Sequence, residues 1–134
     1  MARIKLALPE SEKVYSSEMP LTINFINYGG HMGNDAILTI CQEIRLRYMK
    51  SLKMSELSFH GKSLIQSDAA IVFKNEAFHG DVLTVDLYIE DQHKYGFDFF
   101  YLIKNSAKEI ARAKTGMIFF DYEKRKVVLN PIIE

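Results

Sequence analysis

The sequence predicts an α+β domain in which one long helix packs against an antiparallel β-sheet. A single segment, residues 34–52, carries apolar residues at helical spacing, and several later segments alternate in the manner of β-strands. Nothing else in the sequence offers a second apolar layer. Because the apolar face of a lone helix must be buried, we expect that helix to pack in the concavity of the sheet.

The expected helix has a buried face and a polar flank. Asn34 suits the N-cap position, and Asp35 in the first turn would be stabilised by the positive end of the helix dipole. On the flank, Glu43 stands four residues before Arg47, which favours a surface ion pair. The apolar stripe, spaced by three and four residues, consists of Ile37, Ile40, Cys41, Ile44, Tyr48 and Leu52.

Strand-like segments lie on both sides of this helix. Residues 21–26 form a β-compatible run that ends at Gly29 and Gly30. After the helix, residues 82–90 alternate apolar and polar side chains, as expected of a strand with one buried face. Short polar turns join the later strands, so they should form an antiparallel meander. The other expected strands are 64–73, 97–104 and 110–121.

The composition limits the class of protein. With 134 residues, 48% of them hydrophobic, the chain suits one domain spanning residues 1–134. Lys plus Arg and Asp plus Glu each number 17, so no excess of positive charge would hold a nucleic acid. Cys41 is the sole cysteine, which excludes an internal disulfide and fits a reducing compartment. No apolar run reaches signal-peptide or membrane-spanning length, so we expect a cytoplasmic protein with no membrane partner.

Four segments carry a resemblance to a known family. They are Asn-Tyr-Gly-Gly-His-Met-Gly-Asn at 27–34, Glu-Ile-Arg at 43–45, the Gly-Asp turn within 76–83, and residues 111–116 with the closing Asn130-Pro131. In this order and spacing they resemble, over residues 21–131, the hot-dog thioesterases of the 4-hydroxybenzoyl-CoA thioesterase-like branch. The resemblance implies a hot-dog fold, with an antiparallel sheet wrapped around one long central helix. It also implies an acyl-CoA thioesterase, which hydrolyses an acyl-CoA to free acid and CoA.

One catalytic position departs from the pattern of that branch. Three positions before Gly30, where the family often has an acidic residue serving as nucleophile or general base, this chain has Asn27. An amide side chain cannot ionise and so cannot fill either role. A non-hydrolytic protein that binds acyl thioesters therefore stays open as an alternative function.

The bend ahead of the helix is the candidate active site. Thioester hydrolysis needs hydrogen-bond donors for the developing oxyanion and a group that activates water or attacks the carbon. Glycines admit a ligand close to the backbone, and the free N–H groups of a helix N-terminus attract anions. Gly30, Gly33 and Asn34 are therefore candidates for oxyanion or substrate binding, and Asp35 is the first candidate for base or nucleophile.

Three further residues have both a catalytic and a structural interpretation. Glu43 could be catalytic or only an ion-pair partner, and Asp68 lies either at a site or at a strand end facing water. His31 could polarise the thioester carbonyl, contact CoA, or satisfy backbone groups. A histidine paired with an acid also leaves open a hydratase or dehydratase on the same fold. The four histidines lack metal-ligand spacing, so we expect no metal and no cofactor beyond the CoA of the substrate.

The expected partners are acyl-CoA and further copies of the chain. The phosphates of CoA call for basic side chains, and the candidates are Lys62, Lys74, Arg112 and Lys114. Aromatic residues fall on both faces of the strands that contain residues 97–101 and 119–120. One face can fill the core and the other needs cover, which the resemblance implies to be a second subunit. We therefore expect a homodimer or a homotetramer.

Overall fold

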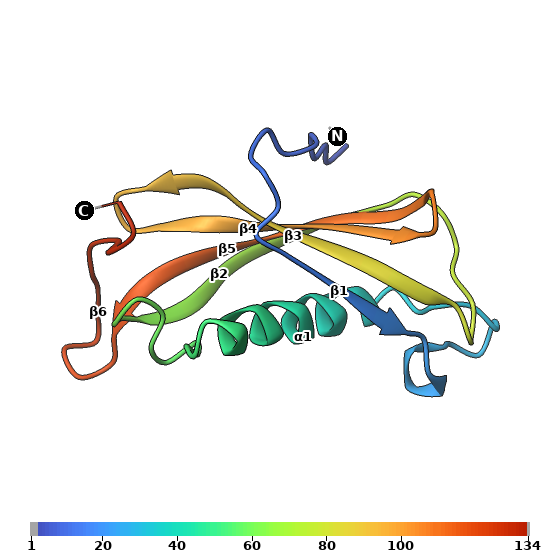
Figure 1. Ribbon diagram of the computed structural model, residues 1–134, viewed down its shortest axis with the longest axis horizontal. Helices are drawn as coiled ribbons and strands as arrows, with labels where there is room; N and C mark the ends of the chain where they lie inside the picture. The colour runs from blue at the N-terminus through green and yellow to red at the C-terminus, as the bar shows by residue number, and fades with distance from the viewer. Residues whose placement is uncertain (1–2, 134) are drawn as a thin grey trace.

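An antiparallel sheet lies along one side of an α-helix in the computed structural model, which describes residues 3–133 (Figure 1). The six strands have the order β1-β3-β4-β5-β2, with β6 paired to β5. The N-terminal elements are β1 (Tyr15–Pro20), the short 3₁₀ helix η1 (Ile23–Phe25) and α1 (Ala36–Ser51). The later strands are β2 (Ser63–Phe73), β3 (Val82–His93), β4 (Gly96–Asn105), β5 (Lys108–Asp121) and β6 (Lys126–Val127).

The core lies between α1 and the inner face of the sheet. Alternate residues of β3 and β4 point toward the helix and are fully buried, including Leu87, Phe97 and Tyr101. Ile40 and Ile44 of the helical stripe are buried against them. The predicted α+β class, with one helix packed on an antiparallel sheet, is confirmed.

The first strand lies earlier in the chain than predicted. The strand expected over 21–26 is wrong, because this segment turns through η1 and only its first residue, Leu21, is buried. The residues that pair with the edge of β3 are instead those of β1, from Tyr15 opposite Leu87 to Pro20 opposite Val82. The sequence of β1 is mostly polar because an edge strand with one solvated face needs few apolar side chains.

The ends of the helix also differ in detail from the prediction. Asn34 is not the N-cap residue: Asp35 occupies that position, and no side chain of the described residues 3–133 caps the first turn. Leu52 lies just past the last helical residue and is 41% exposed, so it does not belong to the buried stripe. Within residues 3–133, no helix is long and apolar enough to cross a membrane.

The outer face of the sheet is covered in part by the chain's own N-terminus. The strap, as we name residues 3–13, crosses this face ahead of β1 (Figure 1). Arg112 of β5 donates a hydrogen bond to the Leu6 carbonyl oxygen at 2.8 Å, and Glu10 N–H donates to the Glu90 carboxylate at 3.1 Å. The aromatic Phe100, which points outward from β4, is only 5% exposed. The strap therefore supplies at least part of the cover that was expected for the outward-facing aromatic side chains.

Candidate active site

The bend ahead of α1 is held by backbone hydrogen bonds to itself and to the loop before β3. Asn27 N–H donates to the His31 carbonyl oxygen at 2.9 Å, and Gly30 N–H donates to the Asn27 carbonyl oxygen at 3.0 Å. Gly30 has a φ of 87°, a conformation that favours glycine. From the other loop, the carbonyl oxygen of Ala77 accepts a hydrogen bond from Met32 N–H at 2.7 Å. The bend is therefore a fixed structure placed directly before the first turn of the helix.

Two backbone donors remain free at the start of the helix. Gly33 N–H, expected to be free, instead donates to the Phe25 carbonyl oxygen at 2.9 Å. Within residues 3–133, the N–H groups of Asn34 and Asp35 donate no hydrogen bond, and both residues are exposed. Asp35 is the N-cap residue and Asn34 precedes it, so both N–H groups lie at the end of the helix where the dipole favours negative charge. An oxyanion could be bound by this pair of donors.

The carboxylate of Asp35 folds back over Gly33. A Cβ atom built on Gly33 would lie only 2.7 Å from Asp35 Oδ1, closer than real Cβ atoms approach an oxygen. The absence of a side chain at position 33 therefore makes room for this carboxylate. The first candidate base lies beside the two free donors and is open to solvent.

His31 is oriented by the backbone of the next residue, Met32. Its Nδ1 lies 3.3 Å from the Met32 carbonyl oxygen. A carbonyl oxygen can only accept, so in this contact Nδ1 carries the proton and Nε2 is left as the basic nitrogen of the neutral ring. A Cβ atom built on Gly29 would lie 3.6 Å from Nε2, which places this nitrogen against the glycine bend.

Asn27 belongs to the same bend but serves a structural contact. Its Oδ1 accepts a hydrogen bond from Gly29 N–H at 2.9 Å, which is a turn closed by an asparagine side chain. The Nδ2 group makes no hydrogen bond within residues 3–133, so one amide donor is left for a ligand. The bend thus brings together Asn27, His31, Asn34 and Asp35.

Two other candidate carboxylates lie elsewhere. Glu43 forms the expected helix-surface ion pair, since Arg47 Nε is 2.6 Å from its Oε2 and Arg47 Nη1 also donates to Ser17 Oγ of β1. Glu43 lines a shallow groove between η1, β1 and α1. Asp68 lies at an irregularity of β2 and pairs with Lys114 at 3.1 Å on the outer face of the sheet. Within a single chain, neither carboxylate joins the bend.

The four basic residues considered for CoA are dispersed. Arg112 is paired with Glu109 and holds the strap, and Lys114 is paired with Asp68. Lys62 immediately precedes β2, at the end of the loop that leaves the C-terminal end of α1. Lys74 begins the loop that pairs with the bend, is exposed, and forms no ion pair within residues 3–133. No group of residues within 3–133 is arranged to hold a metal ion.

Sequence reasoning missed a buried polar network behind the helix. Arg45 is 5% exposed and donates to the Tyr101 hydroxyl at 3.4 Å, and Tyr101 in turn hydrogen bonds Thr115 at 2.7 Å. Burial in the core raises the pKa of Tyr101 well above its ordinary value, so the hydroxyl keeps its proton. The position of Arg45 on the edge of the apolar stripe was the available signal. The network fixes α1 against β4 and β5.

The family comparison assigns the chain to a class. Residues 21–131 match the model of the thioesterase-like superfamily, and this chain belongs to that family. It adopts the hot-dog fold of the solved thioesterases that it resembles. No curated protein matches the chain.

Solved structures of similar fold support the same class. A 1,4-dihydroxy-2-naphthoyl-CoA thioesterase from Synechocystis is 26% identical, with a TM-score of 0.78 over 88% of this chain and 90% of that one. A Staphylococcus aureus protein solved in complex with CoA is 18% identical, with a TM-score of 0.78 over 94% and 82%. A gentisyl-coenzyme A thioesterase is 13% identical, with a TM-score of 0.76 over 87% and 96%. The family and these neighbours support the predicted acyl-CoA thioesterase function.

Proposed function

We propose that this chain hydrolyses an acyl-CoA at the N-terminal end of α1, with Asp35 as the general base. The observation that carries the proposal is the pair of unbonded N–H groups at Asn34 and Asp35, next to the carboxylate that folds over Gly33. Hydrogen-bond donors of this kind lower the reaction barrier most when they point to the atom on which charge develops in the transition state. The bend offers such donors beside an anionic side chain.

The reaction follows from these positions. The thioester carbonyl oxygen accepts hydrogen bonds from the two free N–H groups, which polarises the carbonyl carbon. The Asp35 carboxylate removes a proton from a water molecule, and the water oxygen attacks the carbonyl carbon to form a tetrahedral oxyanion. Collapse of that intermediate breaks the carbon–sulfur bond, and the proton held by Asp35 passes to the departing CoA thiolate. The products are the free acid and CoA.

Asn27 and His31 have supporting parts in this proposal. Asn27 cannot act as nucleophile, but its free Nδ2 group can donate a hydrogen bond to the acyl group or the attacking water. His31 Nε2 can accept a hydrogen bond from the amide-rich arm of CoA. Lys74, at the start of the paired loop, is the candidate for contact with a phosphate of CoA.

The acyl group in this proposal is of medium length or aromatic. Apolar side chains are exposed around the bend, including Tyr28 beside the glycines and Phe78 on the paired loop. Phe73, at the end of β2, is also 49% exposed. The names of two similar solved thioesterases contain an aromatic acyl group, which also supports an aromatic acyl group for this chain.

A second copy of the chain completes the site along the edge of β2. This strand has eleven residues and a single charged side chain, and within residues 3–133 no strand pairs with its outer edge. Ala69 and Phe73 lie opposite the buried Thr115 and Ala111, so they point to the helix side, yet both are exposed. Leu38 and Leu46 on α1 are exposed as well. An open edge with a single charge, beside apolar side chains, favours pairing with the same strand of another copy in a cytoplasmic homodimer.

The activity is tested with the purified chain and a panel of acyl-CoAs spanning short, medium and aromatic acyl groups. We expect release of free thiol from at least one member, with the aromatic or medium acyl groups favoured. Binding to several members without thiol release would instead assign the non-hydrolytic alternative. Consumption of an enoyl-CoA without thiol release would assign the hydratase alternative.

A further inference from the structure

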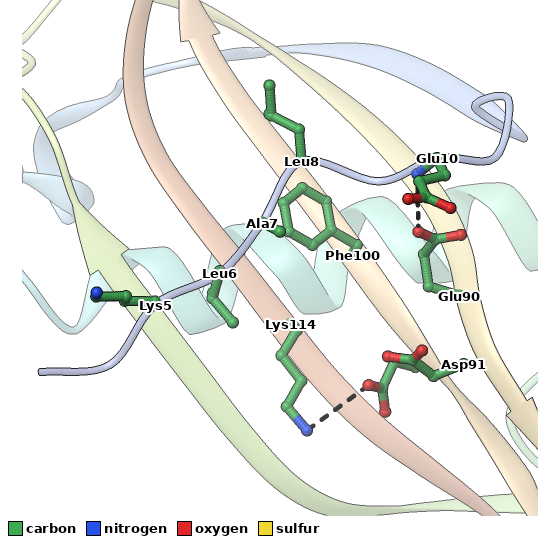
Figure 2. A pocket seen from close by; sticks show the side chains of 10 residues that line it. Lys5, Leu6, Ala7, Leu8, Glu10, Glu90, Asp91, Phe100 and Lys114 are labelled. Atoms are coloured by element: carbon green, nitrogen blue, oxygen red, sulfur yellow. Dashed lines mark hydrogen bonds and ion pairs between the residues drawn. The ribbon is translucent and has the colours of Figure 1, made fainter. Parts of the chain in front are cut away.

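Aromatic side chains outside the core differ in how far the chain covers them. Phe100, which points outward from β4, is only 5% exposed. Figure 2 shows the strap passing over the ring of Phe100, with Ala7 and Leu8 beside the ring. Phe78, in the loop before β3, is instead 48% exposed. An aromatic ring that the chain leaves open beside a candidate active site is available to a ligand.

Residues 31–33 form the middle one of three short extended segments at the entrance to α1. They pair with residues 25–27 on one side, through the N–H groups of Asn27 and Gly33, which each donate a hydrogen bond of 2.9 Å. They pair with residues 77–78 on the other side, through a hydrogen bond of 2.7 Å. Pairing on both sides keeps residues 31–33 extended, so their side chains alternate between two faces.

One face of these segments is buried and the other is open. Met32 and Ala77, on the first face, are 7% and 1% exposed. On the second face, His31 lies opposite Phe78 in an antiparallel pair. The hydrogen bond from Met32 N–H to the Ala77 carbonyl oxygen flanks this pair, which is the arrangement that brings two opposite side chains closest together. The Phe78 ring therefore stands beside the imidazole of His31, with Cβ atoms roughly 5 Å apart.

The Asp35 carboxylate lies on the same open face. Position 33 is two residues after His31 in the extended segment, so a side chain at Gly33 would project to the face of His31. The space for that side chain is taken by Asp35 Oδ1, which lies 2.7 Å from a Cβ atom built on Gly33. The candidate base, the imidazole and the Phe78 ring thus share one face, within reach of one bound thioester.

A second carboxylate fixes the backbone of Phe78. Phe78 N–H donates to Asp81 Oδ2 at 2.9 Å, and Asp81 N–H donates to the Phe78 carbonyl oxygen at 3.0 Å, which closes a turn. The N–H group of Leu21, a buried residue, donates to the Asp81 carbonyl oxygen at 2.8 Å and so ties the turn to the core. The exposed ring is therefore carried by a fixed backbone, and a preorganised group loses little entropy when it binds a ligand.

We propose that Phe78 is the specificity-determining residue of the site, selecting an aromatic acyl group, and that Asp81 is a positioning residue that holds Phe78 beside His31. This role rests on the proposed function, which places the thioester at the same face. Two aromatic rings attract each other in offset or edge-to-face contact, beyond the effect of the apolar area that they bury. The amides of the CoA arm need hydrogen-bond partners, which a phenyl ring does not supply, so the ring favours the acyl side of the substrate.

The test measures the binding of two CoA analogues in which a methylene replaces the thioester sulfur. One is a phenyl ketone that mimics benzoyl-CoA, and the other is a methyl ketone that mimics acetyl-CoA. Calorimetry gives both Kd values for the unaltered chain, for Phe78→Ala and for the control Tyr122→Ala. Tyr122 is a matched control because it is also 48% exposed but lies between β5 and β6.

We expect the unaltered chain to prefer the phenyl ketone. Phe78→Ala should weaken binding of the phenyl ketone about tenfold and change binding of the methyl ketone by less than about twofold. The control should change neither Kd value. An equal loss for both analogues, no loss for either, or an unaltered chain without the preference would each overturn the proposal.

Asp81 is tested by the same ratio of Kd values. Asp81→Ala removes the acceptor of Phe78 N–H and should reduce the preference about threefold, whereas Asp81→Asn keeps a carbonyl oxygen there and should restore the preference. A ratio that stays constant in both variants would overturn the positioning role. If Asp81→Ala does not fold, Gly80→Ala takes its place with the same expected result, because a φ of 90° strains an alanine within the turn.

The selection by Phe78 and the proposed hydrolysis fail separately. A preference for the phenyl ketone that depends on Phe78, without thiol release from benzoyl-CoA, would overturn the hydrolysis and support the selection. Thiol release from benzoyl-CoA, with the preference unchanged in Phe78→Ala, would overturn the selection and support the hydrolysis.

Discussion

The two ends of α1 differ in whether their backbone hydrogen-bonding groups are satisfied. At the C-terminal end, Lys53 takes a left-handed conformation with φ of 59°, Lys53 N–H donates to the Lys50 carbonyl oxygen, and Met54 N–H donates to the Met49 carbonyl oxygen at 2.8 Å. This is the hydrogen-bonding pattern of a Schellman motif, in which the last carbonyl groups are satisfied. Ser51 Oγ adds a bond to the Tyr48 carbonyl oxygen at 2.6 Å.

The N-terminal end has no comparable closure. Among residues 3–133, no side chain caps the first turn, and Asn34 and Asp35, whose N–H groups donate no hydrogen bond, are exposed. The chain can satisfy a helix end, as its other end demonstrates, so the open donors at the N-terminus are free for a ligand. This difference supports the proposal that the chemistry takes place at the N-terminal end of α1 and that the C-terminal end contributes only stability.

The largest effect is expected for Asp35→Asn. This change removes the proposed base but keeps the backbone N–H, so kcat should fall on the order of a hundredfold while the melting temperature changes little. The measurement is steady-state thiol release on the best substrate of the panel. A loss of less than tenfold would move the role of base to another residue, and His31 would be the next candidate within the bend.

A smaller loss of activity is expected for Gly33→Ala. The new Cβ would lie 2.7 Å from Asp35 Oδ1, so it displaces the carboxylate, which is the flexible end of a side chain. Misplacement of a catalytic group by about 1 Å costs roughly ten- to a hundredfold in kcat. The matched control is Gly61→Ala in the loop at the other helix end, where φ is 86°. That control should lose about 1–2 kcal/mol of stability and keep kcat. If kcat fell by the same factor in both variants, the loss at Gly33 could not be attributed to displacement of the Asp35 carboxylate.

His31→Gln should affect binding more than turnover. Loss of one hydrogen bond to the CoA arm is worth about 1 kcal/mol, so KM should rise about fivefold with kcat nearly unchanged. Full kinetic curves for the variant separate the two parameters. A fall in kcat with constant KM would assign His31 to the chemical step instead.

The smallest kinetic effect is expected at the closed end of the helix. Ser51→Ala deletes the hydroxyl that bonds the Tyr48 carbonyl oxygen and should cost about 1 kcal/mol of unfolding free energy. Thiol release should stay at the level of the unaltered chain. A change in kcat at this position would show that the two ends of the helix are coupled, contrary to the division above.

The periodic parts of the fold could be predicted from the sequence. The spacing of Ile37, Ile40 and Ile44 gave the helix, and the alternation within 82–90 gave β3, because both patterns reflect burial of one face. The mostly polar strand β1 was missed because it lies at an edge and needs few apolar residues. Its pairing with β3 depends on contacts distant in the sequence.

The position of the glycine bend could be predicted from the sequence, but its hydrogen bonds could not. The glycine bend ahead of a lone helix indicated where donors would lie, and the structure has the bend there. The sequence does not reveal that Gly33 N–H is taken by Phe25, since that bond depends on the turn through η1. Nor does it reveal that Asp68 faces outward, because a local irregularity in β2 shifts its register against β5. Single-residue effects of this kind leave no periodic pattern.

The central claim is that the open end of α1 binds the acyl carbonyl oxygen. It is tested most directly by recording backbone amide resonances while a CoA ketone analogue, in which a methylene replaces the thioester sulfur, is titrated into the protein. The proposal predicts large downfield shifts of the Asn34 and Asp35 amide protons, with those of Lys53 and Met54 unchanged. Saturable binding of the analogue that leaves the Asn34 and Asp35 amides unshifted would contradict it.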